Sequence, residues 1–302
     1  MCTRNRADSL ARCLASIAAD PTERAAELVV VDNGSTDSTP AVLSGATRES
    51  PRPLRVVRTS ARGHSRARNA GIRSADGAIL LFADDDVVVQ PGWIDALSAP
   101  FADAGVGAVG GRIVPTFLGK RPHWLTDDEV FLPVTLPDYG TQPFRFDDGR
   151  LPIGANMAIR AGLLDPGPFD PRLGHTGKLA IGFDEFFLLT HLARDHTVLY
   201  VPNAVVAHLL DDGRVTLASA RRILFHSGFG FIRYQRMLGR PTPSLLRRVV
   251  RTGRAWSQVR RASDADPIAE LNAWRQAGEQ TEGLLGHRAP WLANWCAAHL
   301  LR

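Results

Sequence analysis

Short apolar runs and stretches with helical spacing alternate along the first hundred residues. A β-branched run over residues 28–31 and mainly apolar runs over 54–57 and 78–82 predict strands. Between them, capping and first-turn residues predict helices that begin near Asp8 or Ser9, at Thr39-Pro40 and near Ser65. Continuous apolar strands that alternate with helices are typical of a parallel sheet covered on both faces. The pattern therefore predicts an α/β fold.

The pattern becomes less regular after residue 90. Periodicity is weak over residues 115–154, a Pro-, Gly- and Asp-rich stretch that we expect to be a functional loop. Elsewhere it predicts helices over 91–104, 183–193 and 219–238, and strands over 106–114, 197–201 and 205–208. After Pro241 and Pro243 the chain turns into an Arg-rich amphipathic helix, followed by one or two helices over 264–302. We expect a domain boundary near residue 236, with a helical extension over 237–302.

Length and composition exclude several classes of protein. The 302 residues correspond to about two domains, or to one large α/β unit with an appendage. Values of 44% apolar and 22% charged residues argue against collagen, coiled coil and long disorder. Neither an apolar run long enough to span a bilayer nor an apolar leader after Met1 occurs, so we expect a cytoplasmic protein. Three widely spaced cysteines argue against a disulfide framework and a zinc site.

The net charge of +5 conceals an asymmetry. Residues 221–261 hold eleven arginines and no acid, whereas residues 1–220 carry a net charge of −4. The basic segment could bind a phosphate-bearing ligand, an anionic membrane face or the acidic surface of the chain itself.

Carboxylates follow two of the predicted strands. Asp32 comes directly after the strand over 28–31, and Asp84, Asp85 and Asp86 follow the strand over 78–82. Parallel sheets bind ligands beyond the carboxyl ends of their strands. Three adjacent carboxylates repel one another unless a cation lies among them, and Mg²⁺ or Mn²⁺ prefers such oxygen ligands. The alternative is an acidic turn that is merely solvated.

Six segments together resemble the successive motifs of family-2 glycosyltransferases with the GT-A fold. They are residues 30–37 (VVDNGSTD), 67–72 (ARNAGI), 82–86 (FADDD), 154–159 (GANMAI), 182–185 (GFDE) and 199–208 (LYVPNAVVAH). The resemblance covers about residues 1–236 and implies a GT-A catalytic domain there. Its expected architecture is a mixed, mainly parallel sheet flanked by helices.

The resemblance implies a nucleotide site. Asp32 would accept a hydrogen bond from the base, and Thr3 and Arg4 would line the same pocket. Arg68, with Asn69 beside it, would lie near the base or the diphosphate. The alternative for Arg68 is an ordinary surface arginine.

The resemblance also implies a metal site and a catalytic base. Asp84 and Asp85 would contact the nucleotide sugar, and Asp84 and Asp86 would bind Mn²⁺ or Mg²⁺. His208 would complete the metal shell, with a structural histidine as the alternative. The cation would neutralise charge on the departing diphosphate.

Asp184, alone or with Glu185, would deprotonate the acceptor hydroxyl, so that the anomeric carbon is inverted. The alternative is that both acids interact with the dipole of the helix that follows them. At Phe183 the chain departs from the family pattern, which usually has an acid there.

A second departure lies at the start of the chain. Family members normally have an apolar strand before the Thr3-Arg4-Asn5 segment, and this chain begins within that segment. We expect the first strand to be reduced to a stub. We also expect that four to six further residues before Met1 would raise solubility and thermal stability.

The sequence thus predicts a metal-dependent, inverting glycosyltransferase that uses a nucleotide-diphosphate sugar and a saccharide or lipid-linked acceptor. Such an enzyme would act in glycan, cell-envelope polysaccharide or glycolipid synthesis. Two alternatives are a non-catalytic nucleotide-sugar binding module and a sugar-phosphate nucleotidyltransferase. The Arg-rich helices indicate peripheral contact with the inner membrane face, or packing on an acidic surface of the chain. We expect no nucleic-acid partner.

Overall fold

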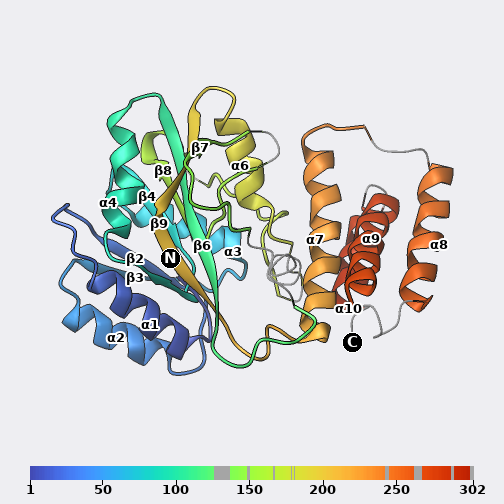
Figure 1. The fold of residues 1–302 in the computed structure, drawn as a ribbon, viewed down its shortest axis with the longest axis horizontal. Helices are drawn as coiled ribbons and strands as arrows, with labels where there is room; N and C mark the ends of the chain where they lie inside the picture. Colours follow the sequence, from blue (N-terminus) through green and yellow to red (C-terminus); the bar gives the residue numbers. More distant parts are fainter. Residues whose placement is uncertain are drawn as a thin grey trace. The chain divides into compact units, whose positions relative to one another are not determined.

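The computed structural model describes the chain except for residues 126–136, 148–149, 166, 178, 180, 242–244, 262–266, 287–288 and 300–302. The chain forms two compact units (Figure 1). The first unit contains Met1–Thr116, Pro137–Pro171 and Asp184–Leu210, and the second contains Phe117–Leu136, Arg172–Phe183 and Asp211–Arg302. Part of the long irregular stretch expected over 115–154 falls on the undescribed residues.

The first unit begins with a three-stranded parallel sheet. Strands β1 (Cys2–Thr3), β2 (Leu28–Asp32) and β3 (Leu54–Arg58) pair in that order. Side chains of successive strand residues point to opposite faces. Val30 packs with Leu10 and Leu43, so α1 (Ala7–Ala18) and α2 (Thr39–Glu49) cover its face of the sheet. Val31 faces α3 (His64–Ser74), where Gly71 allows a close approach.

A second sheet carries the acidic segment. Its strands run in the order β4 (Ile79–Ala83), β8 (Asn156–Arg160), β6 (Val106–Phe117), β9 (Thr197–Leu210) and β5 (Val87–Val89). β7 (Phe144–Arg145) pairs with β9, and α4 (Trp93–Ser98) and the 3₁₀ turns η1 (Ala99–Ala102) and η3 (Ala161–Leu163) lie between strands. The β4–β8, β6–β8, β5–β9 and β7–β9 pairs are antiparallel. The α/β class is therefore confirmed, with parallel pairing in the first sheet and antiparallel pairs in the second.

Two details of the second sheet differ from the sequence expectation. Strand β9 is continuous across Pro202, where the pattern predicts two strands. Its first half pairs with β7 through Leu199 and Tyr200, and its second half pairs with β5 through Val206–His208. These pairings hold both halves in one extended segment. The short strand β5 was not predicted, because three residues are too few for a periodic signal.

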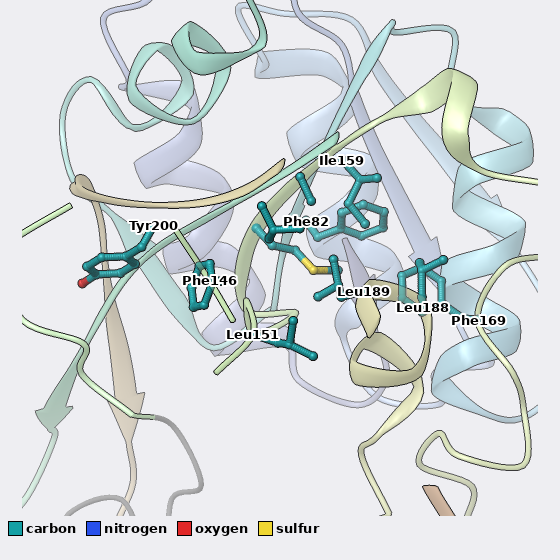
Figure 2. Packing of buried hydrophobic residues seen from close by; sticks show 11 residues of the cluster. Phe82, Phe146, Leu151, Ile159, Phe169, Leu188, Leu189 and Tyr200 are labelled. Atoms are coloured by element: carbon teal, nitrogen blue, oxygen red, sulfur yellow. The ribbon is translucent and has the colours of Figure 1, made fainter. Parts of the chain in front are cut away.

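The main core of the first unit lies between β4, β8, β9 and α6 (Asp184–Leu192) (Figure 2). Phe82 of β4 meets the edge of Phe169, with ring centroids 5.6 Å apart. Leu188 and Leu189 of α6 pack into the same cluster. The acids at the start of α6 are thereby fixed relative to the end of β4.

A cavity of about 480 Å³ lies beside the stub strand β1. Its apolar walls come from Leu28 and Val29 of β2 and from the residues 79–83 of β4. Met1 bonds to β2 through its amino group, which donates to the Val29 carbonyl at 3.1 Å.

The second unit is helical. Helices α7 (Leu217–Met237), α8 (Leu245–Arg261), α9 (Pro267–Leu285) and α10 (Pro290–His299) belong to it, and α9 packs against both α7 and α8 (Figure 1). The structure groups α7 with these helices, so the division of the chain differs from the expected boundary at residue 236. The reason is the contact between α7 and α9, where Gly228 and Gly278 let the two backbones approach closely. Within the described ranges, no helix combines the length and apolar content needed to cross a bilayer.

Candidate active site

The acidic segment connects two strands of the second sheet. β4 ends at Ala83, Asp84–Asp86 turn the chain, and β5 begins at Val87. The turn is fixed from β9, because the Leu209 amide donates to the Asp86 carbonyl at 2.8 Å. Asp85 and Asp86 are buried, and the Asp84 side chain is 34% exposed. These residues are therefore not the solvated acidic turn that the sequence left open.

Arg6 neutralises the two buried acids of this turn. Its Nη1 donates to Asp86 Oδ2 at 2.6 Å and to Asp85 Oδ1 at 3.4 Å. Burial raises the pKa of Asp85 to about 7, against the opposing effect of Arg6. The Arg6 guanidinium, from the start of the chain, thus forms ion pairs with Asp85 and Asp86, which follow β4.

The turn after β1 places Arg6 there. Asn5 adopts φ = 52°, a left-handed conformation that asparagine tolerates better than most residues. Its side-chain Oδ1 accepts a hydrogen bond from the Thr36 backbone amide at 2.7 Å, and its backbone amide donates to Ser35 Oγ at 3.1 Å. Arg6 is anchored as well, since its amide donates to Thr39 Oγ1 at 3.2 Å.

Arg68 of α3 joins the acidic turn to the first residues of α6. Its Nη2 lies 3.7 Å from Asp84 Oδ1, and its Nη1 lies 3.6 Å from Asp184 Oδ1 and 3.2 Å from Glu185 Oε2. The guanidinium also lies over the Phe169 ring, 5.2 Å from its centroid. Arg68 is buried, so the alternative of a surface arginine does not apply.

Asp184 and Glu185 form a buried carboxylate pair at the start of α6. Ser65 Oγ donates to Asp184 Oδ2 at 2.7 Å. Burial opposes ionisation of Asp184, but Arg68 and the hydrogen bonds it receives hold its pKa below the ordinary range. Burial raises the pKa of Glu185 to about 8, and the neighbouring Asp184 charge adds to this effect while Arg68 opposes it. Their place in the first turn of α6 also fits the helix-dipole alternative, but the dipole alone does not explain their burial against Arg68.

His208 of β9 faces the acidic turn from the other side. In the β5–β9 pairing it lies opposite Val87, directly after Asp86. Its Nε2 is 3.4 Å from Asp86 Oδ1, and the ring is buried. A carboxylate and an imidazole thus lie side by side, as in a pair of metal ligands.

These donors fit a divalent cation that is also bound by substrate. No group of three or more His, Cys, Asp or Glu side chains is placed to enclose a metal ion among the residues that the structure describes. Mg²⁺-type sites usually have only one or two carboxylate ligands, together with substrate phosphates. The Asp86–His208 pair meets that requirement with one carboxylate and one imidazole.

The expected nucleotide residues fall into two groups. Thr3 and Asp32 lie opposite each other in the β1–β2 pairing, and both are buried. Asp32 Oδ1 accepts a hydrogen bond from the Ser35 amide at 2.9 Å, so this carboxylate shapes the turn after β2. Arg4 follows Thr3 and is half-buried.

Asn69 does not join this group. Its Nδ2 donates to the Phe169 carbonyl at 2.8 Å, and its Oδ1 accepts from the Phe169 amide at 3.0 Å. Both polar atoms of the side chain therefore hold the segment that carries Phe169. Asn69 positions the ring beneath Arg68.

The sequence did not single out Arg6, Ser65 or His64 for this site. His64 Nε2 lies 4.0 Å from Asp84 Oδ1. Their position in the chain could have indicated a role in the site. Arg6 follows the end of β1, and His64 and Ser65 lie in the first turn of α3. Trp93 is buried and donates from Nε1 to Asn156 Oδ1 at 2.8 Å.

Comparison with known proteins identifies relatives in sequence. Glycosyltransferase AglE of Haloferax volcanii is 29% identical over 114 residues, which is 37% of this chain and 38% of that protein. An N-acetylglucosaminyltransferase of Azorhizobium caulinodans is 26% identical over 211 residues, 68% of this chain and 52% of that protein. Succinoglycan biosynthesis protein ExoU of Rhizobium meliloti is 39% identical over 95 residues, 31% of this chain and 27% of that protein. The chain therefore matches about half or less of each of these relatives.

Solved structures show the same fold. The mannosyltransferase PcManGT from Pyrobaculum calidifontis, in complex with GDP-Man and Mn²⁺, superposes with a TM-score of 0.56 at 21% identity, over 98% of this chain and 74% of its own. GalNAc-T7 with UDP, GalNAc and Mn²⁺ superposes with a TM-score of 0.55 at 16% identity, over 99% of this chain and 57% of its own. These likenesses confirm the GT-A fold. The sequence profile described as "Glycosyl transferase family 2" matches residues 1–166, more than half of the chain, and the chain therefore belongs to that family.

Proposed function

We propose that this family-2 glycosyltransferase transfers a sugar from a nucleotide-diphosphate donor to an acceptor hydroxyl with inversion at the anomeric carbon, and that it requires a divalent cation. The observation that carries the proposal is the contact of Arg68 with both acidic groups. One guanidinium lies 3.7 Å from Asp84 and 3.2 Å from Glu185. Arg68 thus joins the end of β4, where the donor would be bound, to the carboxylates that would activate the acceptor.

On the donor side, Asp32 and Thr3 would receive the base, with Arg4 beside them. Thr3 and Asp32 lie side by side there, because they pair in register across β1 and β2. Asp84 and Asp85 would face the ribose and the diphosphate. Asn69 would act indirectly: it hydrogen-bonds to the backbone of Phe169, whose ring lies beneath the Arg68 guanidinium.

Asp86 and His208, with Asp84, would hold Mn²⁺ or Mg²⁺. When bound, such a cation neutralises the charge that collects on the departing diphosphate. Arg6 would share that task, because its guanidinium already lies on Asp85 and Asp86.

On the acceptor side, Asp184 and Glu185 would take the proton of the attacking hydroxyl as one coupled pair. Ser65 and Arg68 orient Asp184, whose lowered pKa keeps it ionised and able to accept the proton, while the raised pKa of Glu185 keeps that carboxyl protonated near neutral pH. Attack from the face opposite the diphosphate gives inversion.

The comparisons support two sugar classes for the donor. Relatives named N-acetylglucosaminyltransferase and a fold neighbour with GDP-Man and Mn²⁺ favour transfer of N-acetylglucosamine or mannose. The acceptor would be a saccharide or a lipid-linked saccharide of a glycan, cell-envelope polysaccharide or glycolipid. We further propose peripheral contact with the inner membrane face through α8, because Val249 and Val250 are exposed on this Arg-rich helix. Nucleic acid is not part of the proposal.

A thermal-shift screen of UDP-, GDP- and dTDP-sugars, with and without Mn²⁺, tests the donor class. Ligand that binds only the folded chain raises its melting temperature, so one nucleotide should stabilise the protein in a metal-dependent way. Hydrolysis of that nucleotide sugar should then fall about 100-fold or more in Asp86→Ala and in Asp184→Asn. The exposed acid Asp195 provides the control, because Asp195→Asn should keep full activity. Equal activity in all four proteins would contradict the assignment of the site.

A non-catalytic nucleotide-sugar binding module is the second candidate. It is favoured by Phe183, which stacks on Tyr234 with centroids 5.7 Å apart and supplies no carboxylate beside Asp184. The hydrolysis assay separates the two functions, since a module would bind the nucleotide sugar in the thermal-shift screen and show no turnover with any acceptor or with water.

A further inference from the structure

A polar groove lies between α8 and α9 in the second unit. Its volume is about 370 Å³, within the range of small-ligand sites. The lining side chains are arginines and glutamines, with one glutamate and one alanine: Arg251, Arg254, Ala255, Gln258, Arg275, Gln276, Glu279 and Gln280. Ligand sites are mostly lined by apolar residues, so this lining selects for a strongly polar ligand.

The charge of the groove is positive. Its single carboxylate, Glu279, is paired with Arg275 at 2.7 Å within α9. Arg251 and Arg254 are exposed and have no ion-pair partner among the residues that the structure describes. Two guanidinium groups therefore face the groove with their charge uncompensated, and the glutamine amides add hydrogen-bond donors.

The walls of the groove are fixed. At one end Arg248 Nη1 donates to the Gly283 carbonyl at 3.0 Å, and Thr252 Oγ1 donates to the Gln280 carbonyl at 3.1 Å. Ala255 is buried in the core of the second unit, and Trp256 beside it meets the edge of Trp274 at 5.8 Å between centroids. The stretch of α8 that carries Arg251 and Arg254 is therefore held at a set position relative to Arg275 on α9.

We propose that this groove is a binding site for a phosphate group, held by Arg251 and Arg254 with Arg275. Guanidinium groups bind phosphate oxygens through paired, charge-assisted hydrogen bonds, and a groove of this size holds a phosphate or diphosphate. The phosphate is either that of a soluble compound or the headgroup of an anionic lipid. The site belongs to the second unit alone and does not depend on the proposed transferase function.

Titration of the full-length protein with inorganic pyrophosphate, in EDTA, tests the site. Trp256 lies next to Ala255 of the groove and provides a fluorescence signal. We expect the double variant Arg251→Gln/Arg254→Gln to weaken pyrophosphate binding at least tenfold. The matched control is Arg247→Gln/Arg261→Gln, which removes the same charge from exposed positions of α8 outside the groove and should change binding less than twofold.

Gln276→Glu provides an independent test, because it keeps all arginines and adds a carboxylate at an exposed position of the groove. It should also weaken binding at least tenfold. Absence of pyrophosphate binding, or equal weakening in the groove and control variants, would overturn the proposal. Equal weakening would mean that the helix attracts polyanions, RNA included, only through its net charge.

The source of the phosphate follows from a second arm with vesicles. Vesicles of phosphatidylcholine with phosphatidic acid, compared with phosphatidylcholine alone, report on a lipid headgroup. Greater loss of binding in the groove variant than in the control assigns a lipid headgroup, and equal binding of both assigns a soluble phosphate compound. Metal-dependent binding of the nucleotide sugar should be unchanged in all of these variants, which separates a failure of this site from a failure of the proposed function.

Discussion

At the residue scale, Arg68 determines the electrostatics of the first unit. Its buried guanidinium lies within 4 Å of three carboxylates, those of Asp84, Asp184 and Glu185. Buried ion pairs contribute little net stability, but removal of one partner leaves a buried charge without compensation. The sequence gives no hint of this burial, because an Ala-Arg-Asn segment reads as an exposed helix turn.

Replacement of Arg68 with methionine should lower the free energy of unfolding by about 3–5 kcal/mol, because buried carboxylates lose their cation. At pH 9, where Glu185 is ionised, the cost should be smaller in a Glu185→Gln background, which lacks that charge. Urea unfolding of the wild type, both single variants and the double variant measures this difference. Additive effects of the two substitutions would show that Arg68 and Glu185 do not interact.

Stability should also depend on pH through Glu185. Its pKa is raised from 4.5 to about 8 in the folded chain, so between these values the folded state keeps a proton that the unfolded state releases. This contribution is fully present below about pH 4.5 and is lost as the pH rises through 8. The melting temperature should therefore fall less between pH 5 and 8 in Glu185→Gln than in the wild type. Glu49→Gln, at an exposed position, is the control and should behave as the wild type does.

At the element scale, the pairing of α7 with α9 organises the second unit. An added Cβ at Gly278 would collide with the Phe225 carbonyl, and one at Gly228 with the Arg275 carbonyl. Glycine disfavours helices, so helix propensity gives no reason for a glycine at either position. Only the contact between the helices shows why the positions must lack a side chain.

Gly278→Ala should destabilise the second unit by about 1–3 kcal/mol, because the helix backbones must move apart. At Gly283 on the same helix an added Cβ would lie 4.0 Å from Ile232 Cγ2, an ordinary van der Waals contact, so Gly283→Ala should be neutral or stabilise the unit by up to about 1 kcal/mol. Thermal unfolding followed by tryptophan fluorescence compares the two. Equal destabilisation by both would refute the close helix contact as the cause.

At the scale of the whole molecule, charge is divided between the two ends of the chain. Residues 1–220 carry a net charge of −4, and residues 221–261 hold eleven arginines without an acid. Some of these arginines form ion pairs within the second unit, since Arg233 and Arg236 pair with the buried Glu282. Those of α8 at positions 247, 251 and 254 are exposed. Within residues 221–261, the exposed positive charge therefore resides mainly on α8.

This distribution predicts salt-sensitive binding to anionic vesicles. The full-length chain should float with vesicles that contain phosphatidic acid at low salt and lose most of that binding near 0.5 M NaCl, where screening shortens the range of electrostatic attraction to about 4 Å. Vesicles of phosphatidylcholine alone are the control. Binding that persists at high salt would point to apolar insertion of the exposed Val249 and Val250 instead.

The sequence by itself determined the strands and helices of the first unit up to β4, the acids at the end of β4 and the family. These features are local, because apolar spacing and turn residues act within a few positions along the chain. Tertiary structure decided which charges meet: Arg6 reaches Asp86 across 80 residues, and Arg68 reaches Glu185 across 117. Tertiary structure also decided that Asn69 hydrogen-bonds to the Phe169 backbone and that β9 is one strand. It placed α7 in one unit with the C-terminal helices. Such partners depend on packing between distant segments, which no local pattern specifies.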